Sequence, residues 1–381
     1  MDLQNLRHPL VFVRLALLCA ALAGCQSGAP RSTDSPVVFS FATVGDSRQE
    51  PHRPGNTAQD ERWLQSTALF SRILHEVELR RPQALVFNGD MIYGYSTDPA
   101  VIDRQYAFWR GMVAGLMERG TYVLPVPGNH EVQVPQPKAG GGTVKRATAA
   151  QEDAWRANMG DLILDARLWR KISGISPAAW NPDFAPPVGR DGITTDQRQL
   201  SYSFDAGAIH FAIINTDPAG FDESAPAAWL EGDFAAAKAR GARHFFVFGH
   251  KPAFTYVPQR GAMQAKVKEK EDGFASRPEL RDRFWDLVEA YGATYFCGHQ
   301  HVYHASQPRK GAGGRAWQVI VGTAGSPLTV APGQSDNPFD VMYAWAEVGV
   351  HANGNVDVVV RGFAFADAPT VELERWTIAP R

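Results

Sequence analysis

The chain has 381 residues, of which 44% are hydrophobic and 20% are charged, and 38 Lys and Arg residues stand against 40 Asp and Glu residues. The apolar content is sufficient for a packed core, which excludes a disordered or collagen-like chain. The formal net charge of −2 gives no sign of the basic face that nucleic-acid binding requires, so no nucleic-acid-binding surface is expected. Three cysteines are too few for a disulfide scaffold.

Residues 1–24 have the features of a secretory signal. A weakly basic start leads into an apolar stretch at residues 15–21, which is too short to span a bilayer. The sequence Leu-Ala-Gly-Cys at residues 22–25 resembles the lipobox of bacterial lipoproteins. That resemblance implies cleavage before Cys25, a lipid anchor on Cys25, a tether over residues 25–36, and an exported protein held in the bacterial envelope, in the periplasm or at the outer membrane. The alternative is an ordinary secretory peptide that contains a cysteine.

The first part of the mature chain alternates between strands and helices. The apolar pattern predicts a strand at 37–44, a helix at about 60–80, a strand at 84–87, a helix at about 100–118 and a strand at 122–126. This order predicts a parallel sheet with right-handed crossovers.

Residues 135–200 break this pattern. They are rich in Gly, Pro and polar residues, with one predicted helix at about 149–159, and are interpreted as an insertion over one end of the sheet. The strand pattern then resumes. Strands are predicted at 201–205, 208–214, 245–248, 294–297, 317–321, 342–350 and 356–363, with helices at about 225–240 and 277–291.

Five of the predicted strands end in glycine followed by residues that can bind metal. These residues are Asp46, Asp90, Asn129, His250, His299 and His301. Ligands of open α/β sheets gather outside the carboxyl ends of the strands, and glycine allows the backbone to approach such a site closely. Mixed carboxylate, amide and imidazole donors suit zinc, manganese and iron. Because one ion would not need so many ligands, the set predicts two ions that share a carboxylate.

Taken in order, these motifs resemble those of the calcineurin-like metallophosphoesterases. The segments that carry this resemblance are 45–46, 89–93, 128–131, 247–250 and 298–301. Purple acid phosphatases are the closest match, because Tyr93 follows Asp90 by three residues and because Arg48 stands where many relatives have histidine. The similarity covers roughly residues 37–365. It implies one domain over 37–381 with a four-layer α/β/β/α sandwich and a site at the carboxyl ends of the strands.

The resemblance also implies two metal-ligand sets that share Asp90. The set for Fe(III) is Asp46, Tyr93 and His301, and the set for Fe(II), Zn(II) or Mn(II) is Asn129, His250 and His299. His130 would lie beside the substrate as the catalytic residue. The alternative for Tyr93 is a packed aromatic residue, a role that Tyr95 would fill equally well. Glu131 either orients His130 or lies on the surface.

The implied reaction is the hydrolysis of phosphate monoesters by in-line attack of a metal-bridging hydroxide. A phosphodiesterase for nucleotides or phospholipid-type diesters is the alternative enzyme, and a non-catalytic surface-binding lipoprotein is the alternative of another class. The purple enzymes carry a further substrate-site histidine that residues 251–298 lack. Nearby cations that could bind the phosphate instead are Lys251, Arg260 and Lys266. Arg48 could also contact phosphate, or it could pair with a carboxylate. Cys297 is interpreted as a small buried side chain in a core strand.

Overall fold

The computed structural model describes residues 35–261, 263–264 and 273–380. The signal sequence, Cys25 and most of the tether lie outside the described residues, so these features stay predictions. Residues Val37–Arg381 form one compact unit. Within the described ranges, no helix combines the length and the apolar character that crossing a membrane requires.

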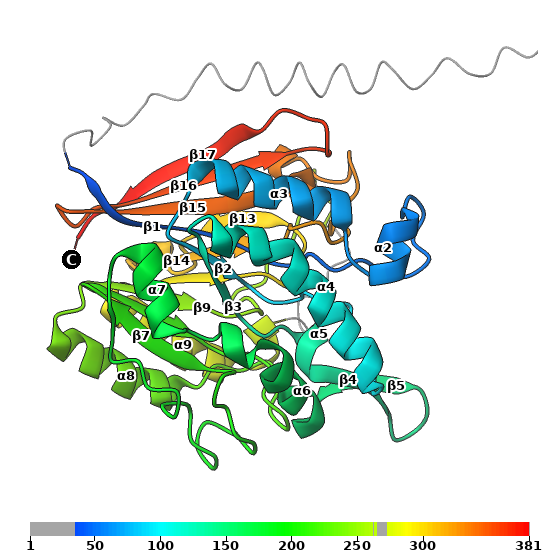
Figure 1. Cartoon of the computed structure of the whole chain (residues 1–381), viewed down its shortest axis with the longest axis horizontal. Coiled ribbons are helices and arrows are strands. Elements are labelled where there is room, and N and C mark those ends of the chain that lie inside the picture. The colour runs from blue at the N-terminus through cyan, green and yellow to red at the C-terminus, as the bar shows by residue number, and fades with distance from the viewer. Residues whose placement is uncertain (1–34, 262, 265–272, 381) are drawn as a thin grey trace, which may run out of the picture. The chain divides into compact units, whose positions relative to one another are not determined.

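Two mixed β-sheets form the centre of the described domain (Figure 1). The six-stranded sheet has the order β17-β16-β15-β1-β2-β3. Its strands are β1 (Val37–Val44), β2 (Ala84–Phe87), β3 (Tyr122–Pro125), β15 (Tyr343–His351), β16 (Val356–Phe363) and β17 (Val371–Ile378). The seven-stranded sheet has the order β13-β14-β12-β9-β8-β7-β6. Its strands are β6 (Pro177–Ala178), β7 (Tyr202–Ala206), β8 (Ile209–Ile213), β9 (His244–Phe248), β12 (Thr294–Cys297), β13 (Tyr303–Ser306) and β14 (Trp317–Val321).

The strands that carry the predicted site motifs run parallel. In one sheet β1 pairs with β2 and β2 with β3, and in the other β9 lies between β8 and β12, all in parallel register. The tail strands β15, β16 and β17 are antiparallel to their neighbours. The predicted parallel order of the first three strands is therefore confirmed. Strands β13 and β17 were not predicted, because β13 is short and β17 is an edge strand in which charged residues alternate with apolar ones.

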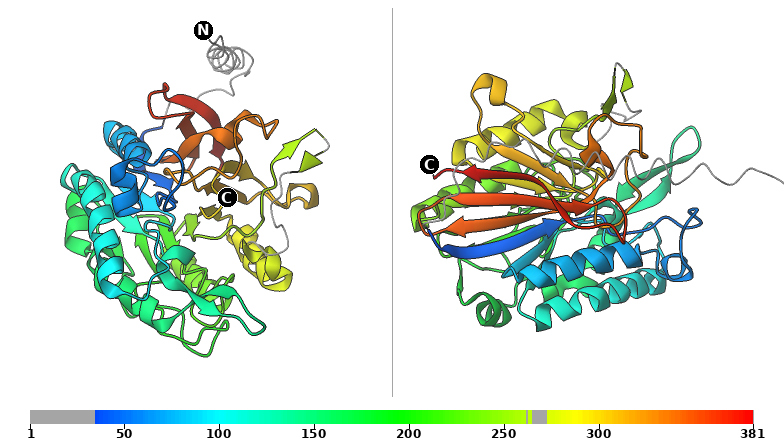
Figure 2. Two further views of the ribbon diagram at one scale, coloured as in Figure 1. Left: turned by 90° about the vertical axis from the view of Figure 1, so that its right-hand side faces the viewer. Right: turned by 90° about the horizontal axis from the view of Figure 1, so that it is seen from above.

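Helices cover the outer faces of both sheets. The helices longer than one turn are α2 (Ala58–Trp63), α3 (Thr67–Arg80), α4 (Pro99–Glu118), α6 (Ala149–Met159), α7 (Ala166–Ser173), α8 (Ala227–Arg240) and α9 (Pro278–Tyr291). In Figure 2, α3 and α4 flank one side of the pair of sheets and α9 flanks the other. The prediction of one helix over 60–80 is wrong, because the chain forms two helices there, α2 and α3. The chain breaks at Leu64, which has a left-handed φ of 52°, and the Asp60 carboxylate accepts a hydrogen bond from the Thr67 amide at the start of α3.

The main core lies between the two sheets. The Phe41 ring of β1 lies 5.0 Å from the Phe246 ring and 5.6 Å from the Phe248 ring, both on β9 of the opposite sheet. The residues that alternate with them along β9, Phe245 and Val247, point to the other face and belong to the cluster formed with α8 and α9. Burying each such aromatic side chain contributes about 1.5–3 kcal/mol. Because both faces of β9 are covered, the predicted four-layer α/β/β/α sandwich is confirmed.

The segment predicted as an insertion contains more structure than the sequence pattern indicated. Its helix at 149–159 is present as α6, but a hairpin of β4 (Gln133–Pro137) and β5 (Thr143–Ala147) precedes it and α7 follows it. The Trp169 ring of α7 lies 5.0 Å from Phe204 and 5.5 Å from Tyr122. Part of this segment thus completes the core between the sheets.

Candidate metal centre

The predicted ligands lie where parallel strands of the two sheets end. Asp46 and Asp90 follow β1 and β2, and Asn129 follows β3 as the first residue of the short helix α5 (Asn129–Val132). His250 follows β9 and His299 follows β12, in the second sheet. The carboxyl ends of parallel strands meet at one edge of a sheet. The fold therefore brings the ligands of the first sheet and the ligands of the second sheet together at one site.

Three of these side chains form one tight group. The Asn129 Oδ1 atom lies 3.0 Å from His250 Nε2 and 2.9 Å from His299 Nδ1, and the two imidazole nitrogens are 3.2 Å apart. Asp90 Oδ1 is 3.1 Å from His250 Nε2. These are donor atoms of the kinds that bind first-row metals, all directed at one point.

A second group adjoins the first. His301 Nε2 lies 3.4 Å from Asp46 Oδ1. Asp46, Asp90 and His250, all buried, have ligand atoms within 4.8 Å of one another. Asp90 therefore lies between the Asp46–His301 group and the Asn129–His250–His299 group, which is the arrangement that a shared carboxylate needs.

Backbone carbonyls orient two of the histidines. His250 Nδ1 lies 2.8 Å from the Asn88 carbonyl oxygen, and His301 Nδ1 lies 2.6 Å from the Pro327 carbonyl oxygen. Because a carbonyl can only accept, Nδ1 donates in each ring, and Nε2 is left as the nitrogen that faces the centre. This pattern of a fixed tautomer is typical of metal-binding histidines, so the residues fit a bound metal.

The backbone around the centre is bent more sharply than most residues tolerate. Asp46, Asp90 and His299 have φ angles of 66°, 54° and 69°, and such left-handed conformations of non-glycine residues concentrate at functional sites. A Cβ atom on Gly298 would overlap the Asp46 carboxylate, and one on Gly128 would overlap Asp90. The glycines in the sequence motifs therefore allow the strand-end loops to come together.

The basic side chains around Asp90 keep its carboxylate ionised. Burial alone would raise the pKa of Asp90, but interactions with His130, His250 and Arg48 outweigh burial and hold this pKa well below its usual range. An ionised carboxylate is what a shared metal ligand must provide.

The Arg48 side chain points at the centre, where each of its guanidinium nitrogens has a partner. Its Nε lies 3.4 Å from Asp90 Oδ2, its Nη2 lies 3.5 Å from His301 Nε2, and its Nη1 lies 3.8 Å from Glu50. The pairing with a carboxylate that the sequence left open is thus present. Contact between Arg48 and phosphate stays a prediction.

Lys251 has a different environment from the one expected of a phosphate contact. Its ammonium group lies 2.7 Å from Asp217 Oδ1 and 3.3 Å from Glu223 Oε1, and only 5% of the residue is exposed. Burial opposes the charge, but Asp217 and Glu223 outweigh it and raise the pKa of Lys251. An ammonium held by two carboxylates anchors the loop after β9 and is poorly placed to bind a substrate.

His130 lies beside Asp90, and its catalytic role beside the substrate stays a prediction. Its Nε2 is 3.6 Å from Asp90 Oδ2, and its Nδ1 donates to the Tyr93 carbonyl. Burial, followed by the nearby Arg48 charge, lowers the pKa of His130 well below its usual range. The Tyr93 ring packs 5.8 Å from both the His130 ring and the Tyr95 ring. Coordination by Tyr93 stays a prediction.

Glu131 is a buried support of the centre. Its carboxylate accepts hydrogen bonds from the backbone amides of Asp90 (2.9 Å), Met91 (2.8 Å), Ile92 (3.1 Å) and Gly128 (2.7 Å), and the residue is 1% exposed. Of the two roles considered from the sequence, surface exposure is wrong. Its recorded hydrogen bonds go to backbone amides and not to the His130 ring, so orientation of His130 by Glu131 stays a prediction. The observed role of Glu131 is to tie the loop after β2 to the loop after β3.

Tyr95, which the sequence pattern predicted only as a packed aromatic residue, contacts one of the proposed ligands. Its hydroxyl accepts a hydrogen bond from Asn129 Nδ2 at 2.7 Å. Because the amide nitrogen is held there, the amide oxygen must face His250 and His299. The Tyr95 ring also lies 4.0 Å from the His130 ring.

Replacing Tyr95 by Phe should weaken the centre without unfolding the protein. The ring and its contact with His130 are kept, but the Asn129 amide loses the partner that fixes its orientation. We expect the affinity for metal to fall about 10- to 100-fold, the range found when residues behind metal ligands are changed. Metal titration of the chelator-treated Tyr95→Phe variant against the unmodified protein measures this, and equal affinities would contradict the role of Tyr95.

Cys297 is the small buried residue that the sequence indicated. It is fully buried at the end of β12, and it is a free thiol in the described part of the chain. Burial, followed by the Asp46 charge, raises the pKa of Cys297 well above its usual range. The thiol is therefore kept neutral, which does not suit a nucleophile.

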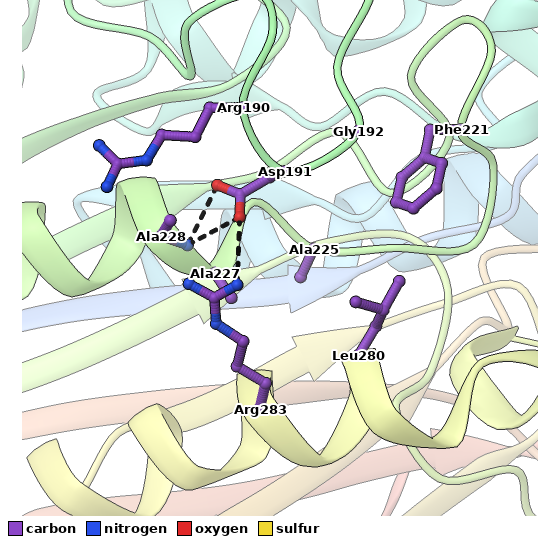
Figure 3. Close-up of a pocket in the computed structure, with 9 residues that line it drawn as sticks. All are labelled: Arg190, Asp191, Gly192, Phe221, Ala225, Ala227, Ala228, Leu280 and Arg283. Atoms are coloured by element: carbon purple, nitrogen blue, oxygen red, sulfur yellow. Dashed lines mark hydrogen bonds and ion pairs between the residues drawn. The ribbon is translucent and has the colours of Figure 1, made fainter.

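A separate cavity of about 260 Å³ shares no residue with the centre (Figure 3). It is lined by Arg190, Asp191, Gly192, Phe221, Ala225, Ala227, Ala228, Leu280 and Arg283. Asp191 accepts hydrogen bonds from the amides of Ala228 and Trp229 and so caps the start of α8. Because these hydrogen bonds engage its carboxylate, Asp191 has a structural role in this cavity.

Comparison with known proteins agrees with this fold. The chain resembles a purple acid phosphatase from yellow lupin (Lupinus luteus), with 16% identity and a TM-score of 0.55 over 92% of this chain, and spans 55% of the lupin chain. It also resembles PhoD, with 11% identity and a TM-score of 0.56 over 92% of this chain and 71% of that one. These likenesses show the fold, while no curated protein sequence gives a significant match. The sequence profile of the calcineurin-like phosphoesterases matches residues 44–303, and the chain belongs to that family.

Proposed function

We propose that the protein is a dimetal hydrolase that cleaves phosphate monoesters, similar to purple acid phosphatases. The observation that carries this proposal is the convergence of Asp46, Asp90 and His250, with ligand atoms within 4.8 Å of one another, at strand ends of both sheets. Membership of the phosphoesterase family supports the reaction class. The fold shared with the lupin purple acid phosphatase supports the subclass.

The donor set divides between two ions. One ion, Fe(III) in the proposed pair, would be held by Asp46, His301 and Tyr93, and the other, Fe(II), Zn(II) or Mn(II), by Asn129, His250 and His299, with Asp90 shared. Two such cations, when bound, lower the pKa of a water molecule and neutralise charge on the phosphoryl oxygens. Tyr93 is the ligand that calls for Fe(III), and a native preparation without a visible charge-transfer band would rule it out.

The protein's own side chains provide the remaining elements of catalysis. His130 turns Nε2 toward the centre because Nδ1 donates to the Tyr93 carbonyl, so Nε2 is the atom through which it would exchange a proton with the leaving oxygen. Arg48 contacts Oδ2 of the Asp90 carboxylate and helps to hold it in position. Phosphoryl transfer needs little covalent help, so such positioning and charge account for most of the expected acceleration.

Turnover of two synthetic esters, before and after chelation, tests the proposal. We expect hydrolysis of p-nitrophenyl phosphate with a higher kcat/KM than that of bis(p-nitrophenyl) phosphate, loss of both activities with a chelator, and recovery when metal is restored. A preference for the bis-ester would favour the phosphodiesterase instead. Absence of chelator-sensitive turnover of either ester would refute the enzyme and favour the surface-binding lipoprotein.

A further inference from the structure

The hairpin β4–β5 presents one lysine to the candidate metal centre. Lys145 lies on β5, opposite Pro135 of β4, and its ammonium nitrogen is 3.6 Å from the centroid of the Tyr95 ring. The same Tyr95 ring contacts His130, and its hydroxyl contacts Asn129. One aromatic ring thus separates the lysine charge from a proposed metal ligand and from the proposed catalytic histidine.

The base of the hairpin is fixed to the body of the protein. Side chains alternate along a strand, so Arg146 points away from Lys145, and its Nη1 lies 3.1 Å from Asp222 Oδ2. On β4, Gln133 Nε2 donates to Asp217 Oδ1 at 3.3 Å. These contacts hold β5 in the register that turns Lys145 toward Tyr95. A cation placed on a supported strand is better positioned than one on a free loop.

Lys145 also differs from Arg48 and Lys251 in having no recorded acidic partner among the described residues. Arg48 contacts Asp90 and Glu50, and Lys251 contacts Asp217 and Glu223. For Lys145, the structure records no ion pair or hydrogen bond within the described residues, and its recorded contact is the Tyr95 ring. Among these three cations, Lys145 is therefore the one with free capacity to bind an anion.

The charge of Lys145 interacts with the centre. Lys145 is an exposed residue of β5. Partial desolvation of its ammonium group, followed by the Arg48 charge, lowers the pKa of Lys145, while Asp90 and Glu50 act in the opposite direction. The ammonium group therefore lies within electrostatic range of the centre, as its contact with the Tyr95 ring also indicates.

We propose that Lys145 is a substrate-binding residue that contacts the phosphate group and makes hairpin β4–β5 a determinant of monoester preference. The inference rests on the proposed hydrolase function. A monoester dianion carries one more negative charge on its phosphoryl oxygens than a diester does. A cation supplied in addition to the two metals stabilises that extra charge and so favours the monoester.

Three variants of the metal-loaded protein test this role. Lys145→Met removes the charge and keeps much of the side chain, Lys145→Arg keeps the charge, and Lys138→Met removes an exposed lysine at the tip of the same hairpin. The readouts are kcat/KM for p-nitrophenyl phosphate and bis(p-nitrophenyl) phosphate, the dissociation constant of inorganic phosphate by calorimetry, and metal content.

For Lys145→Met we expect kcat/KM for the monoester to fall about tenfold, mainly through KM, and phosphate to bind about tenfold more weakly. The diester should change less than about threefold, and metal content should not change. Lys145→Arg should retain most of the monoester activity, and Lys138→Met should match the unmodified protein. Equal losses for both esters, or unchanged phosphate affinity, would overturn the role of Lys145.

The two proposals can fail separately. If the unmodified protein hydrolyses neither ester but binds phosphate, and Lys145→Met weakens that binding while Lys138→Met does not, the hydrolase function falls and the phosphate-binding role stands. If the unmodified, metal-loaded protein binds no phosphate, the role of Lys145 is refuted.

Discussion

Replacing Asp90 by Ala is expected to remove bound metal and activity together. Asp90 lies between the two ligand groups, with Oδ1 at 3.1 Å from His250 Nε2 and Oδ2 at 3.4 Å from Arg48 Nε. Without it, neither proposed ion keeps its shared ligand, and Arg48 loses its main acidic partner. We expect kcat/KM for p-nitrophenyl phosphate to fall by at least about 10³-fold, which corresponds to about 4 kcal/mol of transition-state stabilisation.

Two further variants make this experiment decisive. Asp90→Asn keeps the volume of the side chain and removes its charge, so a loss of metal in this variant reports on coordination and not on a cavity. Asp367→Ala changes an exposed carboxylate and should match the unmodified protein. Metal content by mass spectrometry, activity and the thermal midpoint Tm are measured on all three. Full activity in Asp90→Ala would refute the proposed centre.

The sequence predicted the fold and the set of residues at the centre for one physical reason. Each motif combines an apolar strand, a glycine and a polar residue, and a parallel sheet brings the ends of such strands together. Because Asp46, Asp90 and His250 each lie within three residues of the end of a buried strand, placing the strands was enough to place the side chains. The same short motifs therefore determine both the strand ends and the residues that lie at the centre.

The supporting residues could not be predicted in this way because their roles depend on contacts between distant segments. Tyr95 is one of two aromatic residues in a loop, and only the folded chain shows that its hydroxyl meets Asn129. Lys145 lies 50 residues after Tyr95 in the sequence, on a hairpin within a Gly- and Pro-rich segment that lacks a clear strand pattern. Lys251 follows a motif residue directly, yet Asp217 and Glu223 hold its ammonium group.

Replacing Glu131 tests whether the loops that carry the ligands depend on this one buried carboxylate. In Glu131→Ala, four backbone amides that now donate to the carboxylate lose their partner. An unsatisfied buried donor costs about 1–3 kcal/mol, and partial access of water reduces the sum. We expect the free energy of unfolding to fall by about 4 kcal/mol, a large part of the 5–15 kcal/mol typical of a domain.

Glu131→Gln separates the charge from the shape of the side chain. One amide oxygen remains to accept hydrogen bonds, but the amide nitrogen meets backbone donors and cannot accept from them. We expect a loss of about 2 kcal/mol in the free energy of unfolding, together with metal affinity about 10- to 100-fold weaker, because the loop after β2 carries Asp90 and the loop after β3 carries Asn129. Urea unfolding of the metal-free proteins and metal titration measure the two effects.

The matched control is Glu231→Gln, an exposed change on α8 that should alter neither quantity. If Glu131→Gln weakens metal binding with little loss of stability, Glu131 acts mainly by aligning the ligands. If stability falls and the folded variant binds metal normally, its role is confined to joining the two loops. Unchanged stability and affinity in both Glu131 variants would show that the loops hold their positions through the strand ends alone.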